Sequence, residues 1–276
     1  MKYFIQLKTL FKYFSITKSI GLFSKISFFW LADFGLPLRK NERKIKSFKN
    51  LHKNERCFII GNGPSLNKLD LKKLKNEYTF GVNAIYTYYD KMQFFPSYYI
   101  VEDTFVAEDR SDEINNYKES EKFYGNYLTY CLKPDEKTTL LNVIFDYRNY
   151  PDFPRFSTNA LREINVGGTV TYLCLQMAYY MGFKEVYLIG FDHSYKIPKS
   201  AKIEGNDITS TTDDVNHFSK EYFGKGKRWH DPRTDRMELA YIKANKYFDI
   251  DGRKVFNATA GGQLEVFERV EYDSLF

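Results

Sequence analysis

The sequence predicts an α/β fold in which a mostly parallel sheet carries helices on both faces. Short apolar runs fit buried strands at Cys57–Ile60, Tyr78–Val82, Ser97–Val101 and Glu185–Gly190. Helical patterns lie between several of these runs, and the chain contains no internal repeat. Strands that alternate with helices in this way are typical of a Rossmann-like arrangement.

Each of the first three predicted strands ends in polar or glycine-rich residues. The first runs into the turn Gly61-Asn62-Gly63-Pro64, and the pattern from Ser65 to about residue 75 fits a helix. The second strand ends at Asn83, and the third ends at Glu102 and Asp103. Because ligands gather at the carboxyl ends of strands in such folds, these residues are candidates for a site.

The later elements complete one domain over residues 51–276. They are a region with helical tendency at 104–136, a strand at 140–145, a helix from Gly167-Gly168-Thr169 to about Met181, a polar lid at about 196–233, a helix at about 234–248 and a strand at 254–257. Gly182 suits the end of the first of these helices, since glycine adopts the left-handed C-cap conformation. The lid has weak periodicity, so we expect it to be mobile and partly helical.

Residues 1–50 form a separate basic segment. They hold eleven Lys and Arg against two Asp and Glu, whereas the remaining residues hold 30 and 33. Amphipathic helices are predicted here, with Phe4, Leu7, Phe11 and Phe14 on one face. Lysines interrupt every apolar run before it reaches the roughly 20 residues of a spanning helix, and they also break any signal-peptide core.

Basic amphipathic helices of this kind suit the inner face of an anionic membrane. We therefore expect a cytoplasmic protein that is peripheral at that membrane. The alternative is that the segment packs on the body or forms a contact in a homo-oligomer.

The composition of the body argues against two classes of function. A slightly acidic body disfavours a nucleic-acid partner, because a groove for DNA or RNA would be basic. The three cysteines (Cys57, Cys131 and Cys174) lie in apolar contexts without metal-like spacing. They are predicted to be buried free thiols in a reducing compartment, and no metal site is expected.

The turn after the first strand is the strongest candidate for a ligand site. Its glycines let backbone N–H groups approach a ligand, and a helix N-terminus favours negative charge. Asn62 and Ser65 add side-chain donors. Gly61, Asn62, Gly63, Pro64 and Ser65 are therefore expected to hold the phosphate of a nucleotide; the alternative is a tight turn without a ligand.

Three further positions extend this candidate site. Asn83 can hydrogen-bond a base or a sugar, although a plain strand-end turn would also explain it. Asp192 follows the buried strand at 185–190 and is expected to be exposed at the ligand face. Gly168 and Thr169 open a helix, which offers either another anion or sugar site or close packing of helix and sheet.

Familiar catalytic motifs are absent. The chain lacks the third glycine of the dinucleotide fingerprint, the Gly-Lys-Ser/Thr phosphate loop, His-Glu-x-x-His and Gly-x-Ser-x-Gly. Among its four histidines, His230 lies between Arg228 and Arg233 and could take a proton from an attacking hydroxyl. A surface histidine is the alternative. His193 could line the site, and His52 lies in residues 39–54, which are predicted to be a solvated connector between the N-terminal segment and the body.

Several short motifs together resemble the 6-hydroxymethylpterin diphosphokinase MptE-like family. They are Gly61-Asn-Gly-Pro-Ser-Leu66, Gly81-Val-Asn-Ala84, Gly167-Gly-Thr-Val170, Glu185-Val-Tyr-Leu-Ile-Gly-Phe-Asp192 and Asn257-Ala-Thr-Ala-Gly-Gly-Gln-Leu-Glu265. The resemblance covers about residues 55–272. Many bacterial members of that family resemble proteins of surface-glycan synthesis or flagellin glycosylation.

The chain is also similar to bacterial sialyltransferases that use CMP-sialic acid without a metal. The shared features are the Gly61–Leu66 motif, an Asn at the second strand end, the segment from Met181 to Asp192, and a histidine before Thr234-Asp235. This resemblance implies that His230 is the general base, that Asn62 and Asn83 bind the nucleotide, and that Tyr195 contacts a phosphate. The chain departs from that pattern at Gly167-Gly-Thr and around Trp229, so the donor stays open.

The expected function is therefore that of an inverting, metal-independent glycosyltransferase of a bacterial surface glycan, with His230 and Asp192 in the catalytic site. CMP-sialic acid or a related nonulosonate is the leading donor, a glycan or glycolipid is the acceptor, and no cofactor is needed. One alternative is an ATP-dependent diphosphokinase acting on a pterin-like alcohol, with Mg²⁺ held by Glu102, Asp103 and Asp192. Another is a non-catalytic protein that binds a nucleotide sugar.

Overall fold

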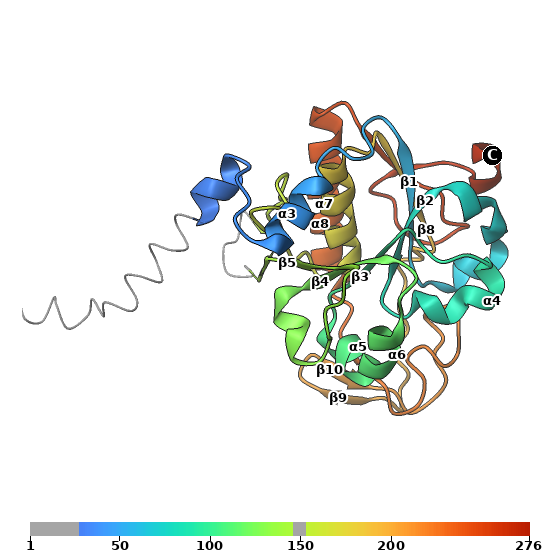
Figure 1. Cartoon of the computed structure of the whole chain (residues 1–276). Helices are drawn as coiled ribbons and strands as arrows, with labels where there is room; N and C mark the ends of the chain where they lie inside the picture. The colour runs from blue at the N-terminus through green and yellow to red at the C-terminus, as the bar shows by residue number, and fades with distance from the viewer. Residues whose placement is uncertain (1–27, 146–152) are drawn as a thin grey trace, which may run out of the picture.

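The computed structural model describes residues 28–145 and 153–276. Eight strands form one sheet in the order β13-β12-β8-β1-β2-β3-β4-β5, and every pair in it is parallel (Figure 1). The strands are β1 (Arg56–Ile60), β2 (Tyr78–Val82), β3 (Tyr98–Val101), β4 (Glu121–Gly125), β5 (Thr138–Leu141), β8 (Glu185–Ile189), β12 (Lys254–Asn257) and β13 (Glu268–Arg269). The predicted parallel Rossmann-like sheet is confirmed.

The chain changes direction across the sheet at β1. From β1 it moves outward through β2, β3, β4 and β5, and it then returns to place β8 on the other side of β1. The crevice between the carboxyl ends of β1 and β8 is therefore the topological switch point, where ligands bind in open α/β sheets.

Helices cover both faces of the sheet, as the sequence predicts (Figure 1). One face carries α3 (Lys40–Ser47), α7 (Val170–Met181) and α8 (Thr234–Ile250), and the other carries α4 (Tyr89–Met92), α5 (Thr104–Asp109), α6 (Ser111–Asn116) and short 3₁₀ turns. Alternate residues of β1 divide between the two cores: Cys57 and Ile59 pack on the α7 side, and Phe58 and Ile60 pack on the other.

The 3₁₀ turns replace a predicted helix. Residues 65–75 form two short pieces, η1 (Pro64–Lys68) and η2 (Leu71–Asn76). The break comes at Asp70, whose carboxylate accepts a hydrogen bond from the N–H of Lys72 and starts η2. The predicted single helix is therefore wrong. The remaining 3₁₀ turns are η3 (Ile85–Tyr88), η4 (Asn126–Tyr130) and η5 (Tyr272–Leu275).

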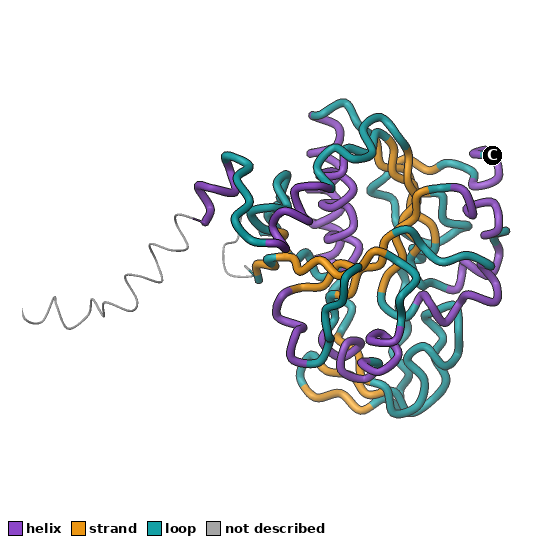
Figure 2. Tube along the Cα trace, in the orientation of Figure 1, coloured by secondary structure: helices purple, strands orange, loops and turns teal. Residues whose placement is uncertain are grey.

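Two small sheets complete the fold. β6 (Val143–Ile144) pairs with β7 (Ile164–Asn165) in parallel. β9 (Lys202–Glu204), β10 (Asp207–Thr209) and β11 (Arg228–His230) form an antiparallel sheet within the predicted lid. Figure 2 shows that the rest of this region is loop, so the expected helical content is wrong.

The segment that is predicted to bind a membrane, residues 1–50, lies mostly outside the described residues. Residues 1–27 are not described, and the structure begins with a short helix at 28–33 followed by α3. Within residues 28–145 and 153–276, no helix has the length and apolar character needed to cross a bilayer. Cys57 and Cys174 are buried free thiols, as predicted, and Cys131 is a partly exposed one.

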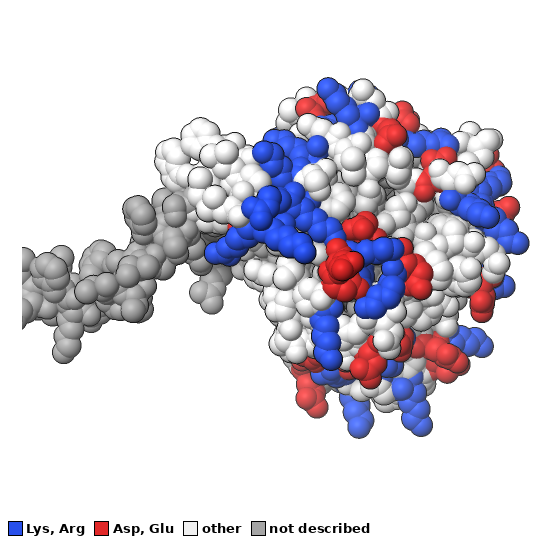
Figure 3. All heavy atoms as spheres, in the orientation of Figure 1, with Lys and Arg blue, Asp and Glu red and all other residues white. Residues whose placement is uncertain are grey.

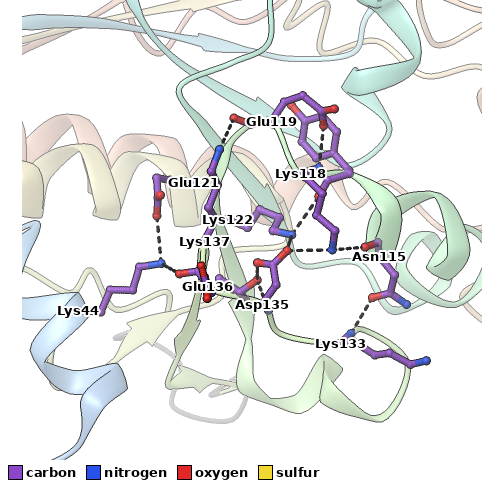
Figure 4. A network of polar contacts seen from close by, with 12 residues as sticks. Lys44, Asn115, Lys118, Glu119, Glu121, Lys122, Lys133, Asp135, Glu136 and Lys137 are labelled. Carbon is purple, nitrogen blue, oxygen red and sulfur yellow. Dashed lines mark hydrogen bonds and ion pairs between the residues drawn. The ribbon is translucent and has the colours of Figure 1, made fainter.

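A buried lysine in β4, an interior strand next to the edge strand β5, explains why β4 was not predicted. Lys122 is 1% exposed, and its ammonium contacts the carboxylate of Asp135 at 2.5 Å and the carbonyl of Tyr117 at 3.0 Å (Figure 4). Lys118 contacts the same carboxylate at 3.0 Å, and Thr138 donates to it. Because its charge is paired, a lysine can occupy an interior strand, in a region whose sequence predicted a helix.

We predict that Asp135→Asn lowers the free energy of unfolding at pH 7 by about 3–5 kcal/mol, since it leaves the Lys122 ammonium buried without an anion. Burial opposes ionisation of Asp135, but hydrogen bonds from Lys122, Thr138 and Lys118 more than offset it and hold its pKa well below the usual range. The pairing therefore stabilises the fold above about pH 4 and is lost as pH falls further. Urea unfolding at pH 7 and pH 3 measures the difference, which should shrink in acid.

The matched control is Lys118→Gln, which removes the more exposed partner and should cost less than about 1 kcal/mol. An Asp135→Asn variant as stable as the native protein at pH 7 would contradict this account.

Candidate functional site

A cavity lies at the switch point between β1 and β8. It is lined by the strand-end loops (Gly61, Asn62, Gly63, Val82, Asn83, Glu102, Asp103 and 190–195), by the start of α7 (168–171), by the lid region (Asn216, His217, Tyr222, Phe223 and 229–232) and by Met237 and Tyr241 of α8. Most residues predicted from the sequence therefore meet there, including His230, which is 147 positions after Asn83 in the chain. Pro64 and Ser65 do not line it.

The floor of the cavity is a close contact between two loops. The N–H of Gly61 donates to the carbonyl of Ile189 at 2.8 Å, and the N–H of Gly63 donates to that of Gly190 at 2.9 Å. A Cβ at Gly63 would lie 1.9 Å from Asp192 Oδ2 and 2.7 Å from the Gly190 oxygen. The glycines are therefore required by the packing of the two loops.

This contact corrects the predicted phosphate cradle. Besides the two glycine amides, the Ser65 amide and hydroxyl both donate to Asp192 Oδ2, at 3.3 and 2.7 Å. Pro64 has no N–H, and η1 is a five-residue 3₁₀ turn. The backbone donors of Gly61, Gly63 and Ser65 therefore bind within the protein and do not form the expected cradle in this structure. That this loop contacts a nucleotide stays a prediction.

Two asparagines at the carboxyl ends of β1 and β2 present uncommitted oxygens. Asn62 is 9% exposed, and its Nδ2 donates to the carbonyl of Val82 and to the hydroxyl of Tyr222, at 3.2 and 2.8 Å. Within the described residues, Oδ1 of Asn62 and Oδ1 of Asn83 are buried without a partner. Such acceptors fit the hydroxyl or amino groups of a ligand, because an unpaired buried acceptor is otherwise costly.

The lid region forms a roof that is attached to this floor. The N–H of Phe218 donates to the Asn62 carbonyl at 2.8 Å, and Asn67 Nδ2 donates to the Phe218 carbonyl at 3.1 Å. Arg110 donates to the carbonyl of Tyr222 at 2.9 Å. Phe218 and Tyr222 are both buried. The roof is thus a packed part of the described structure.

The histidines of the cavity differ in their surroundings. His230 ends β11, is exposed, and lies edge-on to Phe105 with ring centroids 4.2 Å apart. Its imidazole has no hydrogen-bond or ion-pair partner among residues 28–145 and 153–276. A free imidazole at a cavity wall can accept a proton from a bound hydroxyl.

His217, in contrast, is held by a carboxylate. Its Nδ1 lies 2.8 Å from Asp214 Oδ2, and its ring stacks on Tyr222 with centroids 4.2 Å apart. Burial acts to raise the pKa of Asp214, but hydrogen bonds from His217 and from the amides of Asn216 and Phe223 give a net lowering. Asp214 thus stays ionised and orients the ring.

The structure also places the other two histidines, His193 and His52. His193 lines the cavity, and burial lowers its pKa against the opposing charge of Glu238. His52 is buried away from the site between Glu55 and Tyr98, which bind its two ring nitrogens at 2.6 and 2.5 Å. It is therefore a structural core residue.

Two helix N-termini face the cavity. Thr169 caps α7 by accepting a hydrogen bond from the N–H of Thr171 at 3.3 Å, and Gly168 precedes it with φ of 78°. Asp231 and Pro232, just before α8, also line the cavity, and the first turn of α8 lies beside Gly168. The positive ends of two helix dipoles favour an anionic ligand in the space between them.

Three carboxylates complete the lining. Asp192 Oδ2 binds Ser65, and Asp103 Oδ1 accepts from the N–H of Val106 at 3.0 Å, which caps α5. Burial, with a smaller contribution from Asp103, raises the pKa of Glu102 to about 8. In the described parts of the chain, no three His, Cys, Asp or Glu side chains are grouped so that they could hold a metal ion.

Sequence reasoning missed most of the roof. Tyr222, the His217–Asp214 pair and Arg110 act through contacts between residues far apart in the chain. The only local signal is the density of aromatic residues between 217 and 229, which is unusual for a mobile lid.

Comparison with known proteins identifies a family and a similar solved structure. The family model described as 6-hydroxymethylpterin diphosphokinase MptE-like matches residues 37–198. No curated protein matches. The solved structure of MAf glycosyltransferase from Magnetospirillum magneticum AMB-1 has 15% sequence identity and a TM-score of 0.48 to this chain, and the match covers 88% of this chain and 40% of that one. This chain therefore spans less than half the length of that protein.

We predict that Glu102→Gln stabilises the protein in a pH-dependent way. Between pH 4.5 and 8 the folded state keeps the Glu102 proton that the unfolded state releases, so stability falls as pH rises through this window. The variant lacks this penalty and should be more stable than the native protein by up to about 5 kcal/mol above pH 8.

Thermal unfolding of both proteins from pH 4 to 9 measures this difference, which should vanish near pH 4.5. Glu204→Gln, at an exposed carboxylate on β9, is the control and should leave the profile unchanged. Parallel profiles for the native protein and Glu102→Gln would rule the shift out.

Proposed function

This chain belongs to the 6-hydroxymethylpterin diphosphokinase MptE-like family, and from that premise we propose that it is a glycosyltransferase that uses a nucleotide-activated sugar. One observation carries the proposal: the cavity at the switch point presents the uncommitted oxygens of Asn62 and Asn83 together with the free imidazole of His230. Acceptors for a nucleotide and a base for a hydroxyl are the two things that sugar transfer to an alcohol requires.

In this proposal the donor binds between the strand ends and the start of α7. Asn62 and Asn83 accept hydrogen bonds from the hydroxyls of ribose or the amino group of the base. The phosphate lies at the N-terminus of α7, beside Thr169, where the helix dipole favours negative charge. Tyr195 also lines the cavity and is the proposed hydroxyl contact to the phosphate.

His230 is the proposed general base. An acceptor hydroxyl attacks the anomeric carbon, the new C–O bond forms as the bond to the phosphate oxygen breaks, and the hydroxyl proton passes to the imidazole of His230. The electron pair leaves with the nucleotide, and the configuration inverts. The leaving phosphate is stabilised by α7 and Tyr195. Asp192 holds Ser65 and so positions the floor of the site.

CMP-sialic acid or a related nonulosonate is the leading donor, because the Asn62, Asn83 and His230 pattern is similar to that of sialyltransferases. The acceptor would be a hydroxyl of a bacterial surface glycan or glycolipid. A second candidate is the ATP-dependent diphosphokinase, for which the carboxyls of Glu102 and Asp103, both in the cavity lining, would be the Mg²⁺ ligands.

We predict that His230→Ala lowers the rate of sugar transfer by about 10²–10⁴-fold while the dissociation constant for the donor nucleotide stays within about threefold, as the loss of a general base requires. Steady-state transfer to a glycan acceptor and calorimetric nucleotide binding measure the two effects. Lys202→Gln, an exposed change on the same small sheet, is the control. Normal turnover in His230→Ala would contradict the assignment of His230 as general base. A loss of transfer seen only in His217→Ala would assign that role to His217.

We predict that CMP and CDP raise the melting temperature by several degrees in EDTA, since a ligand present at 100 times its dissociation constant adds about 2.7 kcal/mol of stability. A thermal-shift panel of CMP, CDP, UDP, GDP and ATP, with and without Mg²⁺, measures this. Asn62→Ala and Asn83→Ala should each reduce the shift. Stabilisation by ATP that requires Mg²⁺ would favour the diphosphokinase, and binding without turnover of any donor would favour a non-catalytic protein.

A further inference from the structure

The first described residues and α3 together form an exposed surface of apolar and basic side chains. We call it the apolar–basic surface and define it by Trp30, Phe34, Leu36, Leu38, Lys40, Arg43 and Lys46. Its four apolar side chains are 63%, 71%, 53% and 65% exposed, in that order. Clustered apolar groups of this size, next to cations, mark an interaction site.

The apolar side chains are exposed although the segment is anchored to the body. The carbonyl of Ala32, which is 2% exposed, accepts a hydrogen bond from Asn159 Nδ2 at 3.1 Å. Arg162 pairs with Asp33 at 2.7 Å and lies 4.9 Å from the centroid of the Phe29 ring. One side of the segment therefore packs on the body, and Trp30 and Phe34, whose rings stack at 6.2 Å, project from the other.

The cations come from the outer face of α3. Its inner face buries Glu42 and Ile45, while Lys40, Arg43 and Lys46 are exposed. Within the described residues these three cations have no acidic partner. Figure 3 shows Lys and Arg side chains gathered over this helix beside the uncharged projection of the preceding residues.

Lys44 has a different role. It points to the body and pairs with Glu121 at 3.1 Å (Figure 4). The basic residues of α3 thus divide between one that attaches the helix and three that face outward.

We propose that the apolar–basic surface docks on a lipid bilayer that carries anionic headgroups. Trp30 and Phe34 would enter the interface between headgroups and acyl chains, where aromatic rings are favoured, and Lys40, Arg43 and Lys46 would pair with lipid phosphates. The preceding 27 residues continue this chemistry in sequence, with five Lys and no Asp or Glu. A second copy of the chain fits less well, because a twofold contact would bring identical cations together.

This inference does not depend on the proposed sugar transfer, and it is tested without an activity assay. The full chain is mixed with vesicles of phosphatidylcholine alone or with 30% phosphatidylglycerol, and bound protein is separated by flotation. We expect binding to the anionic vesicles that weakens as salt rises.

Two sets of variants in the full chain then locate the contact. Trp30→Ser with Phe34→Ser should lower the partition coefficient at least tenfold. Lys40→Gln, Arg43→Gln and Lys46→Gln together should lower it about a hundredfold, at about fivefold for each cation. The matched controls are Leu239→Ser with Ile250→Ser on α8, and Lys72→Gln, Lys199→Gln and Lys225→Gln together, all of which are exposed elsewhere.

Tryptophan fluorescence provides an independent measurement. The chain has two tryptophans, and Trp229 is 5% exposed, so quenching by brominated lipid reports on Trp30. Emission should fall on anionic vesicles in the native protein and stay unchanged in Trp30→Phe.

Three results would overturn the proposal. The first is vesicle binding that neither variant set reduces, which would place the contact in residues 1–27 alone. The second is equal binding to neutral and anionic vesicles. The third is a dimer in sedimentation that the Trp30 and Phe34 changes dissociate, which would make a second copy the occupant.

Discussion

The contact between the loops that follow β1 and β8 positions everything else in the site. Two amides of one loop bind two carbonyls of the other, and Ser65 binds Asp192 beside them. No side chain fits at Gly63, where a Cβ would meet Asp192 at 1.9 Å. Asn62 lies between the two glycines of this contact, and the roof attaches to its carbonyl through Phe218. Floor and roof are therefore parts of one hydrogen-bonded unit.

The same contact changes how the site can recognise a ligand. In many nucleotide-binding folds the glycine loop gives its amides to a phosphate. Here those amides bind the other loop, so in the proposed function recognition falls to the side chains of Asn62 and Asn83 and to the start of α7. A nucleotide held through its sugar or base at the strand ends, with its phosphate at a helix N-terminus, agrees with this arrangement.

The sequence was informative where residues act through their neighbours in the chain. Apolar runs predicted the central parallel strands, and the strand-end rule brought Asn83 and Asp192 to the cavity correctly. The prediction failed where a residue depends on a partner outside its own segment. β4 contains Lys122, whose charge is compatible with an interior strand because Asp135 pairs with it. The amides of Gly61, Gly63 and Ser65 could not be assigned for the same reason, because tertiary packing decides which acceptor an amide binds. The sequence of the roof has no helix or strand periodicity, because its order comes from contacts to Asn62 and Arg110.

The unpaired oxygens of Asn62 and Asn83 distinguish this cavity from the rest of the interior. Other buried polar atoms without partners occur in the described chain, such as the hydroxyls of Tyr124 and Tyr180, but none of them lines the cavity. A buried acceptor without a donor costs about 1–3 kcal/mol. Asn62 and Asn83 lie at adjacent strand ends under the packed roof. In the proposed function a nucleotide would bring donors to both oxygens, so these two hydrogen bonds would contribute to its affinity.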